Sequence, residues 1–317
     1  MRRFWRVAAG ILALALTVYF LIVASKALDP AMLRQAFASG SVWLAVSMAA
    51  VLYAFIIPVT GWAWSLLLSA RSESWSPAVL SMTLGLSQLA KYIPGNIAQH
   101  AARATLAMRR GMAPTSLVAT VTQETVLAIA ASLIVGLLAL LASGHGLSSL
   151  GSDHANLLMV SAGVLCAAVL LLSVSRLARR YRPGGKVAGT LAALVAMPGW
   201  RATSAALSAY AFNYLLIGAG LWCVAIALGE ATGLSYPVVT SAFALSWLLG
   251  FMTPGSPAGL GAREGIMLML LQGAASSEKL VVFVLLARVV TMVGDVISFL
   301  GAAVLRAQIK QVEAGND

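Results

Sequence analysis

The sequence predicts an all-α polytopic membrane protein with about six to eight transmembrane helices arranged as two inverted repeats. The first observation behind this is composition, because the 317 residues are 60% hydrophobic and only 10% charged. The second is that apolar stretches long enough to cross a bilayer recur from end to end. The third is a motif that occurs twice. No polar stretch is long enough for a soluble catalytic domain. The net charge of +11 is concentrated between apolar spans, so it indicates membrane topology and not a nucleic-acid partner.

The duplicated motif starts with Pro-Gly and ends with arginine. The first copy, PGNIAQHAAR, runs from Pro94 to Arg103, and the second, PGSPAGLGAR, runs from Pro254 to Arg263. The ungapped alignment extends backwards through the pairs Pro77/Pro237, Val79/Val239, Ser81/Ser241 and Leu89/Leu249. Proline and glycine interrupt helices and so leave backbone N–H and C=O groups without helical hydrogen bonds. A membrane tolerates such groups only beside a cavity or within protein. We therefore expect two transmembrane repeats, 1–156 and 157–317, that form one transmembrane domain.

Six apolar segments are long enough to span the bilayer. They lie at 7–25, 41–70, 114–143, 157–175, 201–228 and 280–304. The first follows a basic N-terminus and resembles a signal peptide. Its apolar run is longer than the roughly 7–15 residues of a signal sequence, so we expect a retained helix.

Two further apolar segments end at Pro-Gly. They are 76–93 and 235–253, and each precedes a shorter, moderately amphipathic stretch, at 97–110 and 257–272. Such paired segments are either re-entrant hairpins or, alternatively, ordinary spanning helices joined by Pro-Gly loops. In the hairpin interpretation, Pro94-Gly95 and Pro254-Gly255 form the two tips.

Basic residues favour the hairpins. Arginines at positions 2, 3 and 6 and the basic cluster between 176 and 186 are expected on the cytoplasmic side, whereas 144–156 has neither Lys nor Arg and is expected outside. Arg71, Arg109 and Arg110 then also lie inside, so the first hairpin leaves and returns on the cytoplasmic side. The second hairpin does so on the outer side. Both termini are predicted to be cytoplasmic, in a multi-pass protein of the cell inner membrane.

Each repeat has three full spans, which is an odd number, so the second repeat is inverted in the membrane relative to the first. Inverted repeats that meet at broken helices place a site near the membrane midplane and permit alternating access. The basic cluster between 176 and 186 should also contact anionic lipid headgroups.

Charged residues inside the apolar segments are the candidate substrate-binding residues. They are Lys91, Arg103, Glu124, Arg263, Glu264, Arg288 and Asp295. Placing any of these charges in hydrocarbon costs free energy, so each is expected to face a partner or a water-filled cavity. Arg103 and Arg263 end the two motifs, and the planar donor fork of arginine suits phosphate. Equally, each arginine could form a structural ion pair with Glu124, Glu264 or Asp295.

Other polar residues follow helical spacing. Ser116, Thr120 and Gln123 accompany Glu124, and Arg288, Thr291 and Asp295 form a second stripe. A carboxylate in either stripe could carry a proton or act as a permanent counterion. His100 is expected to line the site. Tryptophans at positions 62, 64, 75, 200 and 247 are interpreted mostly as interfacial anchors. Cys166 and Cys223 are expected to be small packing residues, and no spacing predicts a metal or another cofactor.

These motifs resemble the lysylphosphatidylglycerol synthase transmembrane (flippase-like) family. The similarity rests on Lys91-Tyr92-Ile93-Pro94-Gly95 through Arg103, Glu124, Pro254-Gly255, the run Gly259-Leu260-Gly261-Ala262-Arg263-Glu264-Gly265, and Arg288. Gln99 and His100 depart from the family's usual first motif, and Thr125 replaces a frequent arginine. The family includes the flippase domain of bifunctional synthases and stand-alone proteins near polysaccharide, glycolipid and hopanoid genes. The aminoacyl-transferring domain of the bifunctional members lies beyond the membrane part, so the resemblance implies no lysyl transfer here.

The resulting hypothesis is a lipid flippase rather than an enzyme. It would move an anionic or isoprenoid-phosphate-linked lipid, such as a polyprenyl phosphate, across the inner membrane for envelope glycolipid or polysaccharide synthesis. The alternative is a non-transporting scaffold or regulator of a glycolipid-synthesising enzyme. An intramembrane enzyme comes third, since only Glu124 and Glu264 could supply a reactive pair.

Overall fold

The computed structural model describes residues 30–93, 98–143, 197–253, 259 and 261–315. These ranges form α-helices and one short 3-10 helix and contain no strand. The protein is therefore an all-α membrane protein, as the composition predicts. The predicted spans at 7–25 and 157–175 lie outside the described residues, as do the basic cluster at 176–186 and the tips Pro94, Gly95, Pro254 and Gly255.

Four helical stretches in the described part of the chain are long and apolar enough to cross a membrane. They are Gly40–Ser69, made of α3 (Gly40–Ala54) and α4 (Ile56–Ser69), α7 (Pro114–Ala142), α10 (Trp200–Ala227) and Ser277–Ile309 of α13 (Ser277–Gly315). They correspond to four of the six predicted spans. Helix α13 continues beyond the predicted end at 304 because its polar continuation is rich in strong helix formers. A short helix, α2 (Pro30–Ala38), was not predicted.

The segments around the two motifs form pairs of shorter helices. The first pair is α5 (Pro77–Ser87), continued by the 3-10 helix η1 (Gln88–Tyr92), and α6 (Ala98–Met108); the second is α11 (Tyr236–Met252) and α12 (Ala262–Leu270). The longest, α11, has 17 residues and so measures about 25 Å, less than the roughly 30 Å hydrocarbon layer. Helix α12 starts at 262 and not at the expected 257, because Gly259 and Gly261 have φ of +70° and +79°, which is incompatible with a helix.

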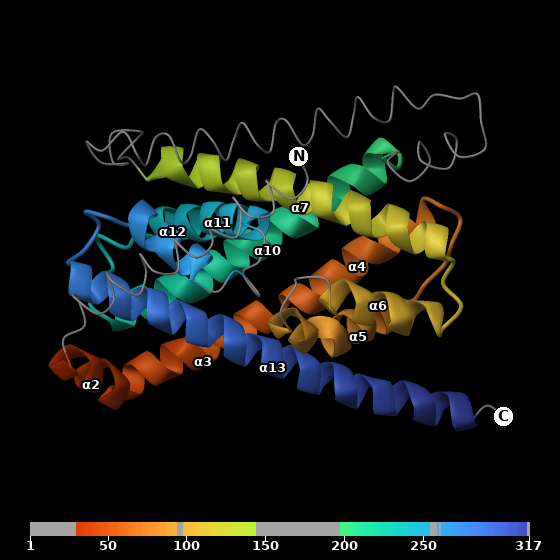
Figure 1. Cartoon of the computed structure of the whole chain (residues 1–317), viewed down its shortest axis with the longest axis horizontal. Helices are drawn as coiled ribbons and strands as arrows, with labels where there is room; N and C mark the ends of the chain where they lie inside the picture. The colour runs from red at the N-terminus through yellow and green to blue at the C-terminus, as the bar shows by residue number, and fades with distance from the viewer. Residues whose placement is uncertain (1–29, 94–97, 144–196, 254–258, 260, 316–317) are drawn as a thin grey trace, which may run out of the picture.

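Each pair of short helices starts and ends at one end of the bundle. A hydrogen bond from Ser116 to Glu73 joins the start of α7, just after α6, to the turn before α5. An ion pair between Lys279 and Glu230 likewise joins the start of α13, just after α12, to the turn before α11. In Figure 1 these two sets of connections lie at opposite ends of the bundle. This arrangement is the one expected of two oppositely directed hairpins.

Helix packing in the two halves follows one pattern. Helix α5 packs against α4 and α13, whereas α11 packs against α10 and α7; α6 contacts α7, and α12 contacts α13. Every one of these contacts has its counterpart in the other half, and α3 packs against α10 where the halves meet (Figure 1). Glycines allow these close approaches, since a Cβ at Gly85 of α5 would lie 2.5 Å from the Ala302 Cβ of α13. The inverted orientation of the halves in a membrane stays a prediction.

Cysteine labelling tests that orientation. We expect single cysteines at Ser74 and Arg109 to react with a membrane-impermeant reagent only from the cytoplasmic side. A cysteine at the exposed Ala231, next to Glu230, should react only from the opposite side. All three variants would be made in a chain without Cys166 and Cys223. Labelling of position 109 from outside would contradict the inverted-hairpin arrangement, because the charge argument requires that turn to be cytoplasmic.

Candidate functional site

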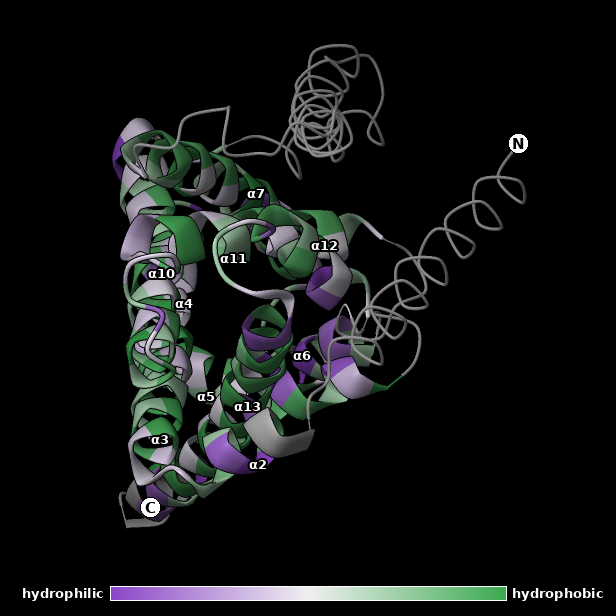
Figure 2. Cartoon of the chain, turned by 90° about the vertical axis from the view of Figure 1, so that its left-hand side faces the viewer, coloured by the Kyte–Doolittle hydropathy of each residue, from purple (hydrophilic) through white to green (hydrophobic). Residues whose placement is uncertain are grey.

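A cavity of about 610 Å³ lies inside the bundle, and both pairs of short helices contribute to its wall. This volume falls within the range of about 300–1,000 Å³ that is typical of ligand pockets. Six of the seven predicted charged residues line it, namely Lys91, Arg103, Glu124, Arg263, Arg288 and Asp295. The seventh, Glu264, lies behind the wall and binds Arg288. Figure 2 shows hydrophilic residues on α6, α12 and α13, among helices that are otherwise apolar.

Both terminal nitrogens of Arg103 are engaged in the wall of this cavity. Its Nη1 donates to Glu124 Oε1 at 3.0 Å, and its Nη2 donates to Glu124 Oε2 at 2.6 Å. The guanidinium carbon lies 3.6 Å from the centre of the Trp64 ring, and Trp64 Nε1 donates to Thr120 Oγ1 at 2.9 Å. Arg103 therefore forms one of the ion pairs that the sequence allowed, and this pair joins α6 to α7. The prediction of Trp64 as an interfacial anchor was wrong, because this residue is fully buried beneath the arginine.

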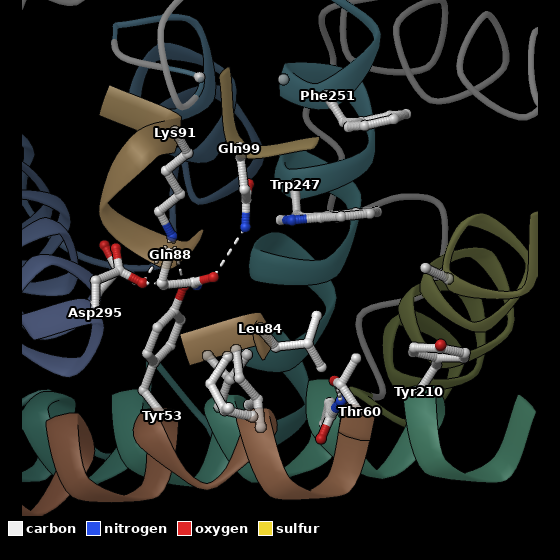
Figure 3. Close-up of a pocket in the computed structure, with 18 of the residues that line it drawn as sticks. Tyr53, Thr60, Leu84, Gln88, Lys91, Gln99, Tyr210, Trp247, Phe251 and Asp295 are labelled. Carbon is white, nitrogen blue, oxygen red and sulfur yellow. Dashed lines mark hydrogen bonds and ion pairs between the residues drawn. The ribbon is translucent and has the colours of Figure 1, made fainter. Parts of the chain in front are cut away.

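Asp295 is the centre of a second polar network, drawn in Figure 3. Its Oδ1 accepts from Lys91 Nζ at 2.7 Å and from Gln88 Nε2 at 2.9 Å, and its Oδ2 accepts from the Tyr92 hydroxyl. Gln99 of α6 donates in turn to Gln88 Oε1 at 2.9 Å. The carboxylate is completely buried. This network ties both helices of the first pair to α13, so a buried charge with three donors holds the hairpin in place.

Glu264 explains the glycine-rich second motif. Its Oε2 accepts the backbone N–H of Gly261 at 2.7 Å, which caps the start of α12, and its Oε1 accepts from Arg288 Nη1 at 3.2 Å. The cap requires the chain to turn sharply just before the helix, which the positive φ of Gly261 allows. Glu264 therefore links the second pair of short helices to α13.

Arg263 differs from the other three cations of the cavity. Its guanidinium lies over the Phe243 ring, 4.4 Å from the ring centre. Within the described ranges, no carboxylate lies at ion-pairing distance from it, whereas Lys91, Arg103 and Arg288 each have one. Four cations therefore face or adjoin three carboxylates, which leaves one net positive charge.

The sequences of α7 and α13 show the same difference. Helix α7 supplies Glu124 to Arg103, but at the spacing of 160 residues that relates the two motifs α13 has Val284. One turn further on, α13 carries Arg288 where α7 has Ala128. The acid that pairs the first motif arginine thus has no counterpart for the second. The predicted equivalence of Arg103 and Arg263 extends to their place in the motif and not to their partners.

An uncharged wall completes the cavity. It includes Thr60 of α4, Tyr210, Asn213 and Tyr214 of α10, and Trp247 and Phe251 of α11. The rings of Trp247 and Phe251 are stacked, with centres 5.4 Å apart and planes 8° apart. Trp247 was predicted as an interfacial anchor, and this was wrong because it lines the cavity. None of these neutral residues was predicted as part of the site.

The remaining polar predictions are located as follows. His100 lines the cavity, as expected, and so does Thr291, between Arg288 and Asp295 on α13. Ser116, Thr120 and Gln123 are buried along α7 beside Glu124. Among the described residues, no cluster of His, Cys, Asp or Glu has the arrangement of a metal site. Cys223 is a free, half-buried thiol, and Cys166 lies outside the described residues.

The comparison with known families agrees with this geometry. A family model described as the lysylphosphatidylglycerol synthase TM region matches residues 10–298, which include both motifs and all seven charged residues. The chain belongs to this family. Membership in the lysylphosphatidylglycerol synthase transmembrane family confirms the resemblance seen in the sequence and identifies a membrane protein involved in lipid handling. No curated protein matches the chain significantly.

Proposed function

We propose that this protein is a lipid transporter of the cell inner membrane. It moves a lipid with an anionic, phosphate-bearing headgroup, such as an isoprenoid-phosphate-linked lipid, between the leaflets for envelope glycolipid or polysaccharide synthesis. The observation that carries this proposal is Arg263, a cation in an intramembrane cavity that has no carboxylate partner among the described residues. Such a charge is costly without a counterion, and a phosphate ligand supplies one in bidentate geometry.

Among the cavity cations, Arg263 is assigned the first phosphate contact. Arg103 already has both terminal nitrogens on Glu124, and Lys91 is bound to Asp295. Recruiting either cation to a ligand would require an existing buried pair to break, which is expensive. In this proposal Arg103 and Lys91 therefore stabilise the cavity wall through their ion pairs, whereas Arg263 contacts the ligand.

In this proposal the two hairpins supply the means of alternating access. Helix α6 carries Arg103 and follows the tip Pro94-Gly95, and α12 carries Arg263 and follows the tip Pro254-Gly255. In the proposed cycle each hairpin opens the cavity toward its own side of the membrane, as inverted repeats with broken helices permit. The basic cluster at 176–186 would concentrate anionic lipids on the cytoplasmic side.

Reconstitution tests the transport proposal. Purified protein in liposomes should speed the movement of a fluorescent phosphatidylglycerol between leaflets, measured by the fraction that a membrane-impermeant quencher reaches with time. A fluorescent phosphatidylcholine, whose headgroup has no net charge, is the comparison and should move more slowly. Empty liposomes give the background. Binding of the anionic lipid without any movement would contradict the transporter and favour the scaffold or regulator of a glycolipid-synthesising enzyme.

A further inference from the structure

We propose that the cavity contains, beside its phosphate site, a subsite for an uncharged, hydroxyl-rich headgroup such as a sugar or another polyol. The same cavity discriminates against cationic headgroups. This inference rests on the proposed function, because it takes Arg263 as the phosphate contact. It adds the chemical class of the group that the phosphate carries.

Two buried polar groups on α10 point to such a ligand. Tyr210 is 5% exposed and Asn213 is 8% exposed, and both line the cavity. The Tyr210 hydroxyl and the Asn213 Oδ1 atom have no hydrogen-bond partner in the described part of the chain. Asn213 Nδ2 donates to Thr60 Oγ1 at 3.1 Å, which fixes the amide and leaves its oxygen available. Buried polar groups are normally satisfied, so this hydroxyl and this acceptor fit the hydroxyls of a ligand.

The aromatic wall beside these groups suits a sugar or polyol ring. Trp247 and Phe251 are stacked, and the Tyr214 ring meets Trp247 edge-on with centres 5.6 Å apart. In Figure 3, Trp247 lies between the Lys91–Asp295 network on one side and Tyr210 on the other. The C–H face of such a ring packs on an aromatic ring while its hydroxyls reach polar neighbours. The aromatic pair thus supplies a surface for the apolar face, and α10 supplies the polar contacts.

The carboxylates of the site already accept hydrogen bonds on both oxygens. Both oxygens of Glu124 accept from Arg103, and both oxygens of Asp295 accept from side chains of η1. Both oxygens of Glu264 are bound as well, to Gly261 and Arg288. Once the lipid phosphate has neutralised Arg263, an ammonium group would add an uncompensated positive charge to the cavity, beside carboxylates that already have donors on both oxygens. A neutral polyol adds no such charge.

Binding of lipids with matched acyl chains to the purified protein tests the inference. The probes are phosphatidylinositol, phosphatidylethanol, which has the same charge but no headgroup hydroxyl, and lysylphosphatidylglycerol, and the readout is each lipid's dissociation constant in nanodiscs. Phosphatidylinositol should bind tightest and the lysyl lipid weakest. Inositol phosphate without acyl chains should bind more weakly than phosphatidylinositol; equal binding would overturn the lipid assignment, because it would assign the subsite to a soluble ester.

Substitutions then separate the subsite from the phosphate site. Tyr210→Phe and Asn213→Leu should each weaken phosphatidylinositol binding by about three- to tenfold, the effect of one neutral hydrogen bond, and leave phosphatidylethanol binding unchanged. Tyr236→Phe is the matched control, because the Tyr236 hydroxyl bonds to the Leu215 carbonyl outside the cavity. Arg263→Gln should weaken the binding of both lipids.

The possible failures are distinguishable. If wild-type protein binds phosphatidylinositol and phosphatidylethanol equally, or if Tyr210→Phe and Asn213→Leu change neither affinity, the polyol subsite is wrong. Tight binding of the lysyl lipid would equally overturn it. In each of these cases the phosphate site stands as long as Arg263→Gln weakens binding. If Arg263→Gln changes no affinity, the proposed function itself fails.

Discussion

Replacing Arg263 by glutamine is expected to abolish transport, lowering the rate of phosphatidylglycerol movement by about 100-fold or more, while folded protein accumulates normally. Hydrogen bonds to charged groups contribute about 1.5–3 kcal/mol each, so a bidentate contact with phosphate is worth at least about 3 kcal/mol. Folding should be spared for a reason visible in the structure. Arg263 has no carboxylate partner among the described residues, so its replacement leaves none of their buried carboxylates without a cation.

The comparison variants sharpen this expectation. Arg263→Lys retains the charge but loses the planar fork, so it should recover part of the activity. Arg306→Gln removes one positive charge from an exposed position on α13 and should leave transport unchanged. Transport is measured per unit of monodisperse protein in each case. Normal transport by reconstituted Arg263→Gln would show that this arginine is not the phosphate site.

The charged part of the site could be predicted from sequence because charge is conspicuous in apolar segments. Six of the seven intramembrane charges line one cavity, and the seventh backs it. Their pairing could not be predicted. Lys91 finds its partner 204 residues away, in Asp295, and that choice depends on how η1 packs against α13. The same holds for Arg263, which has no acid at ion-pairing distance in the part of the chain that the structure describes, because of the side chains that α13 presents.

The neutral part of the site was missed for the opposite reason. Tyr210 and Asn213 lie in a long apolar span, where an isolated polar residue barely changes hydropathy. Trp64 and Trp247 were assigned to the membrane interface by residue type. Both lie within an apolar segment and not at its end, and that position was the available signal for a buried or cavity-lining role.

Hydropathy also decided how well the helices were predicted. The long spans α7 and α10 begin and end within one residue of the expected positions, because bilayer-length apolar runs have sharp limits. The start of α12 was missed because it depends on two glycines with positive φ and on the Glu264 cap. Backbone conformation of that kind leaves no trace in a hydropathy pattern.

Arg103→Gln should produce the opposite phenotype from Arg263→Gln, namely loss of stability. Removing one partner of a buried ion pair typically costs about 3–5 kcal/mol, because the other charge is left unpaired. Here Glu124 would lose both hydrogen bonds, and Trp64 would lose the guanidinium that covers its ring. We expect the temperature at which half of the protein leaves the monodisperse chromatographic peak to fall by several degrees or more.

The double variant Arg103→Gln with Glu124→Gln decides whether this loss comes from the orphaned acid. It should regain much of the lost stability, since two neutral amides can hydrogen-bond to each other without a buried charge. Lys279→Gln is the matched control, because the Lys279–Glu230 pair is partly exposed and should contribute no more than about 1 kcal/mol. If Arg103→Gln is instead as stable as the wild type but cannot move lipid, then Arg103 contacts the substrate, and the division of roles between the two motif arginines is wrong.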